Sequence, residues 1–459
     1  MAEREPGAEV RPEGRFVLGL GLIAAAGFFA RLMVVLRVPT RPVDDFWSYF
    51  ERARLLWELH QYGPFPGRPD AGYPPAYPLL LAIAHAAPAH ELGIAKLLNC
   101  LLGTAFIVLA GLLARRLWGP WAGLAAALLA ALAPRSVVLP AILASENLFA
   151  PLLLGWVLLL AVSWDRPRAA STAGAAGVVL GLLTLTRSVA WLLGFLWPVA
   201  ALLAGKKGRA VLAETALVLL AQHAVLLPWA VRNQVTLGRF TVLSSVGGID
   251  LFLGNSEGAT GDWYDWRPAL AKIEPRLPEM GVFEVDDAAG RAAREWIREN
   301  PQKAVAFYFR RLDRILLQDE SYVVHYLATG SGYAPPETSK PVIGGPHPVR
   351  DHSAHLARVL NLARWGIAGL GLAGCGILLA RAAGRRSRRA AAELAVFLGG
   401  AAYFPLVAAV FLGSTRFRWP TLDLLLIPAA LAVSVVAGRQ PSATLRSSRA
   451  STERAGSGE

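Results

Sequence analysis

Long apolar stretches separated by short polar loops make up most of this chain. A helix needs about 20 apolar residues to cross a hydrocarbon core roughly 30 Å thick. The segments that fit this description are residues 16–38, 93–114, 120–141, 146–163, 171–187, 189–204, 210–230, 356–380, 390–413 and 420–438. The pattern predicts an all-α polytopic membrane protein with about ten transmembrane helices.

The composition agrees with this class of protein. Of the 459 residues, 54% are hydrophobic and 17% are charged, whereas soluble domains carry about 25% charged residues. So apolar a chain is not intrinsically disordered either. Both cysteines, Cys100 and Cys375, lie inside apolar segments. The sequence therefore predicts neither a disulfide framework nor a cysteine-based metal or redox site.

Positive charge gathers in the short loops between the apolar segments. Such loops stay on the cytoplasmic side of a membrane. With the N-terminus inside, the loops that fall on this side are 115–116, 166–168, 206–209 and 381–389, together with the basic tail. We therefore expect a multi-pass protein of the cell (inner) membrane with both termini in the cytoplasm. This placement explains the net charge of +13 without a nucleic-acid partner.

Two longer segments then fall on the outer side. Residues 39–92 begin with an amphipathic helix from Asp45, and their apolar part at 73–89 predicts a helix lying in the membrane interface. Residues 232–355 are slightly acidic and predict a mixed extracytoplasmic cap, in which Pro301 starts a new amphipathic helix. The predicted domains are an N-terminal transmembrane module (1–231), this extracytoplasmic domain (232–355), C-terminal transmembrane helices (356–438) and a disordered basic tail (439–459).

Acidic residues on the outer side are the first candidates for chemistry. Asp44 and Asp45 follow Pro42, where a carboxylate can cap a helix, but one of them can instead face a site as a general base. Glu146 follows Ser145 at the outer end of an apolar segment. The Ser-Glu pair can be a helix cap; alternatively Glu146 faces a cavity, because a charge deep in a bilayer costs roughly 2.5–3.5 kcal/mol. Both alternatives stay open.

Arginines at the same side are candidates for binding an anion. Arg187 lies in a turn between two apolar segments, and Arg416 and Arg418 precede the last one. A guanidinium group binds phosphate well. Alternatively, Arg187 can extend to lipid headgroups, and Arg416 and Arg418 can be interfacial anchors together with Trp419.

Other polar residues give weaker signals. Gln222 and His223 lie within an apolar segment and predict hydrogen bonds between helices. No histidine spacing typical of a metal site is found, so no metal ligand is predicted. A divalent cation is kept as a possible cofactor.

A set of short motifs resembles the GT-C superfamily of membrane glycosyltransferases, and within it the protein O-mannosyltransferase, aminoarabinose transferase and Rgt-like branch. The motifs, spread over most of the chain, are Asp44-Asp45, 73–78 (YPPAYP), Ser145-Glu146, Leu185-Thr186-Arg187, 227–233 (LPWAVRN), 238–240 (GRF), 254–256 (GNS), 297–301 (IRENP) and 416–420 (RFRWP). Their order and spacing are typical of the superfamily, not of one member.

The resemblance implies a hexosyl- or pentosyltransferase that uses a polyprenyl-phosphate-linked sugar at the outer face and inverts the anomeric carbon. Its other partners would be membrane lipids and an unknown acceptor, which can be a lipid, a glycan or a protein. By this analogy either Asp44 or Asp45 deprotonates the acceptor, and the position of Asp45 relative to the family's motif fits this role better. Glu146 holds the acceptor or tunes that base. The cations that would stabilise the departing phosphate are Arg187, Arg416 and Arg418.

Two functions of other classes remain as alternatives. A transporter or flippase of lipid-linked sugars would need polar residues along a membrane path and often repeated halves. No internal repeat is evident, and the candidate residues gather at one face, which favours chemistry there. The other alternative is a non-enzymatic assembly factor that uses residues 232–355 as a binding module.

Overall fold

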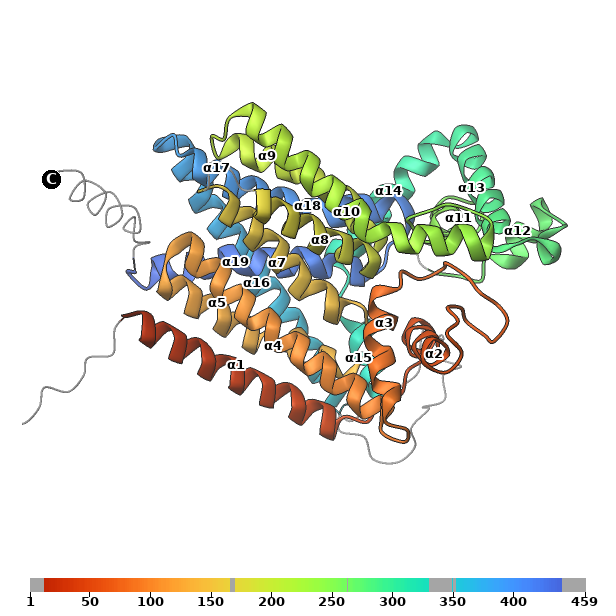
Figure 1. The fold of residues 1–459 in the computed structure, drawn as a ribbon, viewed down its shortest axis with the longest axis horizontal. Helices are drawn as coiled ribbons and strands as arrows, with labels where there is room; N and C mark the ends of the chain where they lie inside the picture. Colours follow the sequence, from red (N-terminus) through yellow and green to blue (C-terminus); the bar gives the residue numbers. More distant parts are fainter. Residues whose placement is uncertain (1–11, 166–169, 262, 330–348, 350–351, 440–459) are drawn as a thin grey trace, which may run out of the picture.

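The regular structure of this chain is helical. The computed structural model describes residues 12–165, 170–261, 263–329, 349 and 352–439, and no strand occurs among them. The long apolar helices form one bundle along the longest axis of the molecule (Figure 1). Its members are α1 (Pro12–Arg37), α4 (Glu91–Trp118), α5 (Pro120–Leu132), α7 (Glu146–Ser163), α8 (Ala170–Thr186), α9 (Leu196–Leu203), α10 (Gly208–Leu237), α16 (Ser353–Gly384), α17 (Arg388–Leu394), α18 (Gly400–Phe411) and α19 (Trp419–Val436).

The predicted fold class is confirmed. In the described part of the chain, seven helices are long and apolar enough to cross a membrane, one of them being the continuous run Arg388–Phe411. An eighth span requires counting α5 together with α6 (Pro134–Val138) and η2 (Leu139–Ala141), a pair bent by 58°. The predicted segments 171–187 and 189–204 are shorter apolar helices. The chain is therefore a multi-pass membrane protein, and the count of ten spans stays a prediction.

Most of the remaining helices gather at one end of the bundle, which we call the cap end (Figure 1). They are α2 (Asp44–Leu59), α3 (Ala76–Ala82), η1 (Ile83–Ala86), α11 (Gly247–Gly254), α12 (Arg267–Ile273), η4 (Leu277–Glu279), α13 (Val282–Glu299), α14 (Pro301–Leu317) and α15 (Ser321–Thr329). The helix predicted within 73–89 corresponds to α3 and η1, and the expected break at Pro301 separates α13 from α14. The described part of 232–355, expected to be mixed, contains helices and connecting segments.

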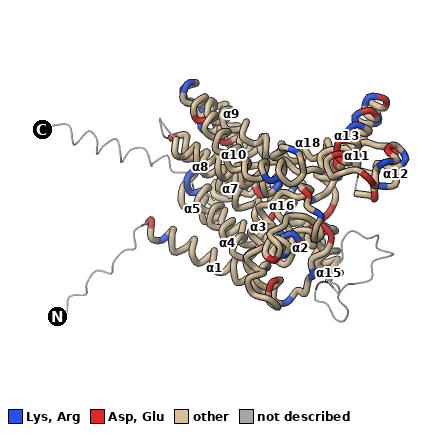
Figure 2. The backbone as a smooth tube through the Cα atoms, turned by 45° about the vertical axis from the view of Figure 1, so that its right-hand side comes forward, with Lys and Arg blue, Asp and Glu red and all other residues tan. Residues whose placement is uncertain are grey.

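The basic loops that the structure describes lie at the other end of the bundle (Figure 2). Arg116, in the last turn of α4, and Arg389 of α17 both form ion pairs with Asp165. The same two helices are also joined by the indole of Trp118, which donates a 2.9 Å hydrogen bond to the buried carboxylate of Glu393. The loops expected in the cytoplasm therefore come together, opposite the cap end. Residues 166–168 and 440–459 lie outside the described residues.

A buried arginine stabilises the bend after α5. Pro134 lacks the N–H group that would reach the carbonyl of Ala130 in a continuous helix. The side chain of Arg31, in α1, donates to this carbonyl at 3.0 Å and to the carbonyl of Gly27 at 2.9 Å. An unsatisfied carbonyl in the hydrocarbon region costs several kcal/mol. Arg31 therefore makes the bend compatible with burial.

The two polar residues predicted to join helices behave differently. The amide of Gln222 donates to the hydroxyl of Thr184 at 3.3 Å and to the carbonyl of Trp191 at 3.0 Å, so the prediction is confirmed for Gln222. It is wrong for His223. The ring of His223 is exposed and makes its hydrogen bond with Leu219, one turn earlier in the same helix, because the two neighbouring positions face different directions.

We predict that Arg31→Met lowers the stability of the protein by about 1–3 kcal/mol, since it leaves the Ala130 carbonyl without a donor. The measurement is the unfolding midpoint of the detergent-purified protein. Arg37→Met, at an exposed position of the same helix, is the control. Equal midpoints for the two variants would contradict this role of Arg31.

Candidate active site

Residues from distant parts of the sequence meet at the cap end around one acidic side chain, Glu146. Glu146 is the first residue of α7, and Arg187 directly follows α8. Asp45 lies in the first turn of α2, and Arg416 belongs to the short helix η7 (Thr415–Arg418) just before α19. Each side chain thus stands at the end of a helix or in a short connecting helix, where the packed bundle fixes its position.

The Glu146 carboxylate is held between two guanidinium groups. It accepts hydrogen bonds from Nε and Nη2 of Arg416 at 2.9 and 3.0 Å, and from Nη1 of Arg187 at 2.6 Å. Only 3% of the Glu146 side chain is exposed. Charge-assisted, bidentate bonds of this kind are strong and directional. They fix both arginines at one place, and without Glu146 two like charges would face each other.

Asp45 joins the same group of charges. Its carboxylate accepts a 2.9 Å bond from Nη1 of Arg416 and a 2.5 Å bond from the hydroxyl of Tyr73. The Asp45 side chain is 43% exposed, so a molecule in solution can reach it. Asp44 is exposed and has φ 49°, a left-handed conformation that aspartate tolerates better than most residues.

Two tyrosines complete the site, and the sequence did not predict their roles. The hydroxyl of Tyr49 donates to Ser145 Oγ at 3.3 Å, and Tyr73 donates to Asp45. Burial, followed by the charge of Asp45, raises the pKa of both phenols, so they act as donors. Tyr49 lies four residues after Asp45 on one helix face, a signal that could have found it. Tyr73 carries no such signal.

Ser145 does not have the capping role that one interpretation gave it. Its side chain makes no capping hydrogen bond to α7. It instead contacts Tyr49 and, at 3.5 Å, Nη1 of Arg187. The Ser-Glu pair is thus part of the charged site.

Aromatic rings support the two arginines. The guanidinium carbon of Arg416 lies 5.1 Å from the ring centre of Phe46, and that of Arg187 lies 5.6 Å from Phe417. Cation–π contacts of this kind orient a guanidinium group without using its N–H donors. Nε and Nη2 of Arg187 have no hydrogen-bond partner among the described residues, so they are available to an anion.

Arg418 lies apart from this site. It binds Oε1 of Glu320 through Nη2 at 2.8 Å and donates to carbonyl groups at the end of α14, including Ile315 at 3.0 Å. Its side chain is 2% exposed. The structure therefore does not bring Arg418 to Glu146 with Arg187 and Arg416. Arg418 anchors η7 to the C-terminus of α14 instead.

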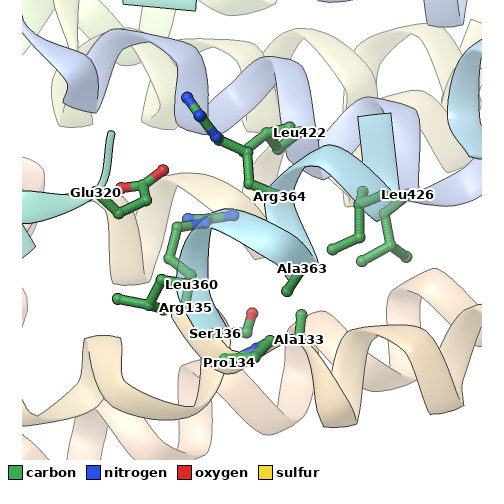
Figure 3. Close-up of a pocket in the computed structure, with 11 residues that line it drawn as sticks. Ala133, Pro134, Arg135, Ser136, Glu320, Leu360, Ala363, Arg364, Leu422 and Leu426 are labelled. Atoms are coloured by element: carbon green, nitrogen blue, oxygen red, sulfur yellow. The ribbon is translucent and has the colours of Figure 1, made fainter. Parts of the chain in front are cut away.

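Glu320 borders a second, smaller group of buried charges (Figure 3). Together with Arg135 and Arg364 it lines a cavity of about 20 Å³, room for about one water molecule. Arg364 donates to the carbonyl of Gln318 at 2.7 Å, and Arg135 pairs with Asp423. These contacts join α16 to the end of α14 and α6 to α19, so their role is structural.

An open pocket of about 560 Å³ lies between α2 and α3 on one side and α8 and α10 on the other. Apolar and aromatic side chains dominate its lining, among them Leu79, Leu185 and Trp229. Arg232 in its wall donates to the carbonyls of Asp70 and Tyr62, both at 2.6 Å. The pocket therefore adjoins the loop that carries Tyr73.

The candidate site does not offer a formed metal centre. Among the described residues, no group of three or more His, Cys, Asp or Glu could hold a metal ion. The oxygens of Asp45 and Glu146 are engaged by arginines and a tyrosine, which do not suit a cation ligand set.

No protein-family model matches this chain, and no curated protein matches its sequence. Solved structures do. An oligosaccharyltransferase of Archaeoglobus fulgidus in its apo form covers 96% of this chain with a TM-score of 0.54 and 16% identity. The same archaeal enzyme, AglB, in complex with an inhibitory peptide and a dolichol-phosphate, covers 93% with a TM-score of 0.57 and 15% identity.

The chain shares the fold of these oligosaccharyltransferases. It spans about half of their length, 52% and 51% in the two structures. At these identities the likeness shows the fold alone. Membership of the GT-C superfamily and of its narrower branch therefore stays a prediction.

We predict that Glu320→Ala destabilises the protein by about 3–5 kcal/mol, because it leaves the buried charge of Arg418 unpaired. Unfolding midpoints in detergent measure this loss. The exposed Glu299, at the end of α13, provides the control variant Glu299→Ala. A loss no larger than that of the control would show that the Arg418–Glu320 pair is not needed.

Proposed function

We propose that this protein is a glycosyltransferase that moves a sugar from a polyprenyl-phosphate donor to an acceptor hydroxyl with inversion of the anomeric carbon. The observation that carries the proposal is the arrangement of Arg187 and Arg416 around Glu146, directly beside the accessible carboxylate of Asp45. A general base next to an anion site is what this transfer needs.

In the proposed reaction, the bond between the sugar and the phosphate is replaced by a bond between the sugar and the acceptor. The acceptor oxygen attacks the anomeric carbon and a new C–O bond forms, while the bond from that carbon to the phosphate oxygen breaks. The bonding electrons leave with the polyprenyl phosphate, and Asp45 takes the proton of the acceptor. Arg416 and Tyr73 hold the Asp45 carboxylate in a fixed direction, which places it for proton transfer.

Arg187 and Arg416 stabilise the departing phosphate. Negative charge grows on the phosphate oxygens in the transition state, and fixed cations in a site largely shielded from water oppose it at no cost of reorganisation. The free donors Nε and Nη2 of Arg187 are the contacts that we assign to it. Glu146 is a positioning residue that keeps both guanidinium groups in place. Arg418 has no part in phosphate binding in this proposal.

The surroundings of the site suit a lipid donor. The apolar pocket of about 560 Å³ next to the site offers room for isoprene units. We place the cap end at the outer face of the membrane, because the described basic loops lie at the opposite end (Figure 2). That AglB was solved with a dolichol-phosphate and a peptide fits a lipid phosphate as donor. Membrane lipids and an acceptor complete the proposed partners.

The alternative functions are less well supported. A flippase of lipid-linked sugars would need its polar residues along the bundle, whereas Asp45, Glu146 and Arg187 meet at one end. An assembly factor would not need an aspartate engaged by Arg416 and Tyr73. In reconstituted vesicles, movement of a lipid-linked sugar without cleavage of its bond to phosphate would support transport instead.

We predict that Asp45→Asn lowers transfer by about 10²–10⁴-fold, because an amide cannot accept the proton. The assay follows radiolabelled sugar from a panel of polyprenyl-phosphate sugars to acceptors, with the purified variant. Asp44→Asn is the matched control and should transfer sugar at a much higher rate. If both variants kept the full rate, Asp45 would not be the base.

We predict that Arg187→Gln weakens the binding of undecaprenyl phosphate by about 10- to 100-fold, the loss of one charge-assisted contact. Native mass spectrometry of the purified protein measures the affinity. Arg267→Gln, which changes an exposed arginine of α12, should bind the lipid as the wild type does. Unchanged binding by Arg187→Gln would remove this arginine from the phosphate site.

A further inference from the structure

A third carboxylate, that of Asp250, stands beside the proposed site, and no sequence pattern singled it out. The backbone N–H of Ser245 donates to the carbonyl of Ala71 at 2.9 Å. Ala71 is two residues before Tyr73, whose hydroxyl donates to Asp45. Helix α11, which contains Asp250, starts at Gly247. The segment that leads into α11 is thus attached to the loop whose Tyr73 binds Asp45.

Helix α11 is fixed at both of its ends. The N–H groups of Gly248 and Ile249 donate to Oδ1 of Asp286, in α13, at 2.7 and 2.9 Å. A β-carbon on Gly248 would lie 1.9 Å from the carbonyl oxygen of Asp286, so the two helices are in direct contact. At the other end, the amide of Asn255 donates to the carbonyl of Val410 at 3.1 Å. Asp250 is therefore held on a rigid support.

The Asp250 carboxylate has no partner within the part of the chain that the structure describes. It is half-buried, and it forms no hydrogen bond or ion pair with a described residue. Burial, followed by the charges of Asp286 and Asp45, raises its pKa to about 7. The backbone N–H of Asp250 donates to the carbonyl of Val246 at 2.8 Å, and a β-carbon on Gly72, next to Tyr73, would lie 3.7 Å from Cγ1 of Val246. The turn that carries Asp250 therefore packs against the loop that holds Asp45. A half-buried carboxyl group without a partner is costly to keep, so a ligand group that binds it would relieve this cost.

We propose that Asp250 recognises the acceptor by binding a hydroxyl group that neighbours the one deprotonated by Asp45. This inference rests on the proposed function and adds the class of acceptor, which is a polyhydroxylated one such as a glycan or a glycolipid headgroup. Arg187 and Glu146 lie where the membrane helices α7 and α8 end and would face the donor phosphate. Asp250 comes from the cap, the side from which an acceptor in solution approaches.

A carboxyl group suits this task. It accepts a hydrogen bond from a hydroxyl when ionised and can also donate one when protonated. A site built to bind a substrate hydroxyl discriminates strongly against an analogue that lacks it, because its own polar group is left unpaired. Asp250 would therefore determine selectivity for the acceptor while leaving the donor phosphate contacts unchanged.

The test compares acceptors with and without the neighbouring hydroxyl. Purified full-length wild type, Asp250→Asn and the exposed-acid control Asp265→Asn are given a panel of polyprenyl-phosphate sugars. The acceptors are n-octyl glycosides, their monodeoxy analogues, and a peptide containing serine and threonine. We expect the wild type to lose about 10- to 100-fold in kcat/KM with one deoxy analogue, Asp250→Asn to show a difference of about twofold or less, and the control to behave as the wild type.

Further readouts separate selectivity from folding. Asp250→Asn should bind undecaprenyl phosphate as the wild type does, and Asp250→Glu should restore part of the discrimination. The inference is overturned if Asp250→Asn still rejects the deoxy analogue, if it loses affinity for undecaprenyl phosphate, or if only the peptide accepts sugar. If the wild type transfers sugar to no acceptor and does not bind undecaprenyl phosphate, the proposed function itself fails.

Discussion

The pairing of one buried carboxylate with two guanidinium groups determines how the cap end of this protein is built. Glu146 is almost fully buried and engages Arg187 and Arg416 together. Removing charges from water is expensive, and such a group is stable only when every charge has well-oriented partners. The ends of α7 and α8 and the turn before α19 therefore have to meet at this point, and Asp45 is drawn to it through Arg416.

The helix η7 shows how one short segment serves both the site and its support. In a 3₁₀ helix of about three residues per turn, side chains two positions apart point in clearly different directions. Arg416 accordingly faces Glu146, and Arg418 faces the end of α14. The support is extensive, since Arg418 binds both Glu320 and backbone carbonyls. The position of Arg416 is therefore coupled to the packing of the cap helices.

Much of the architecture could be predicted from the sequence, because apolar length and proline position report directly on helices. The bundle, the break at Pro301 and the start of α2 followed from such local signals. Contacts between residues that are far apart in the sequence could not be predicted in this way. Tyr73 reaches Asp45 from a loop that leaves no periodic pattern, and the 58° bend within 120–141 depends on Arg31 from another helix. The different directions of Arg416 and Arg418 likewise depend on which kind of helix carries them.

The contacts at the end opposite the cap constrain how the molecule can move. Asp165 joins Arg116 to Arg389, and Trp118 is joined to Glu393 below them, so early and late transmembrane helices are tied together there. Contacts between these helices restrict their relative motion at this end of the bundle. The ends of α4 and α17 are therefore expected to move as one unit, because any separation of the two would break the ion pairs of Asp165.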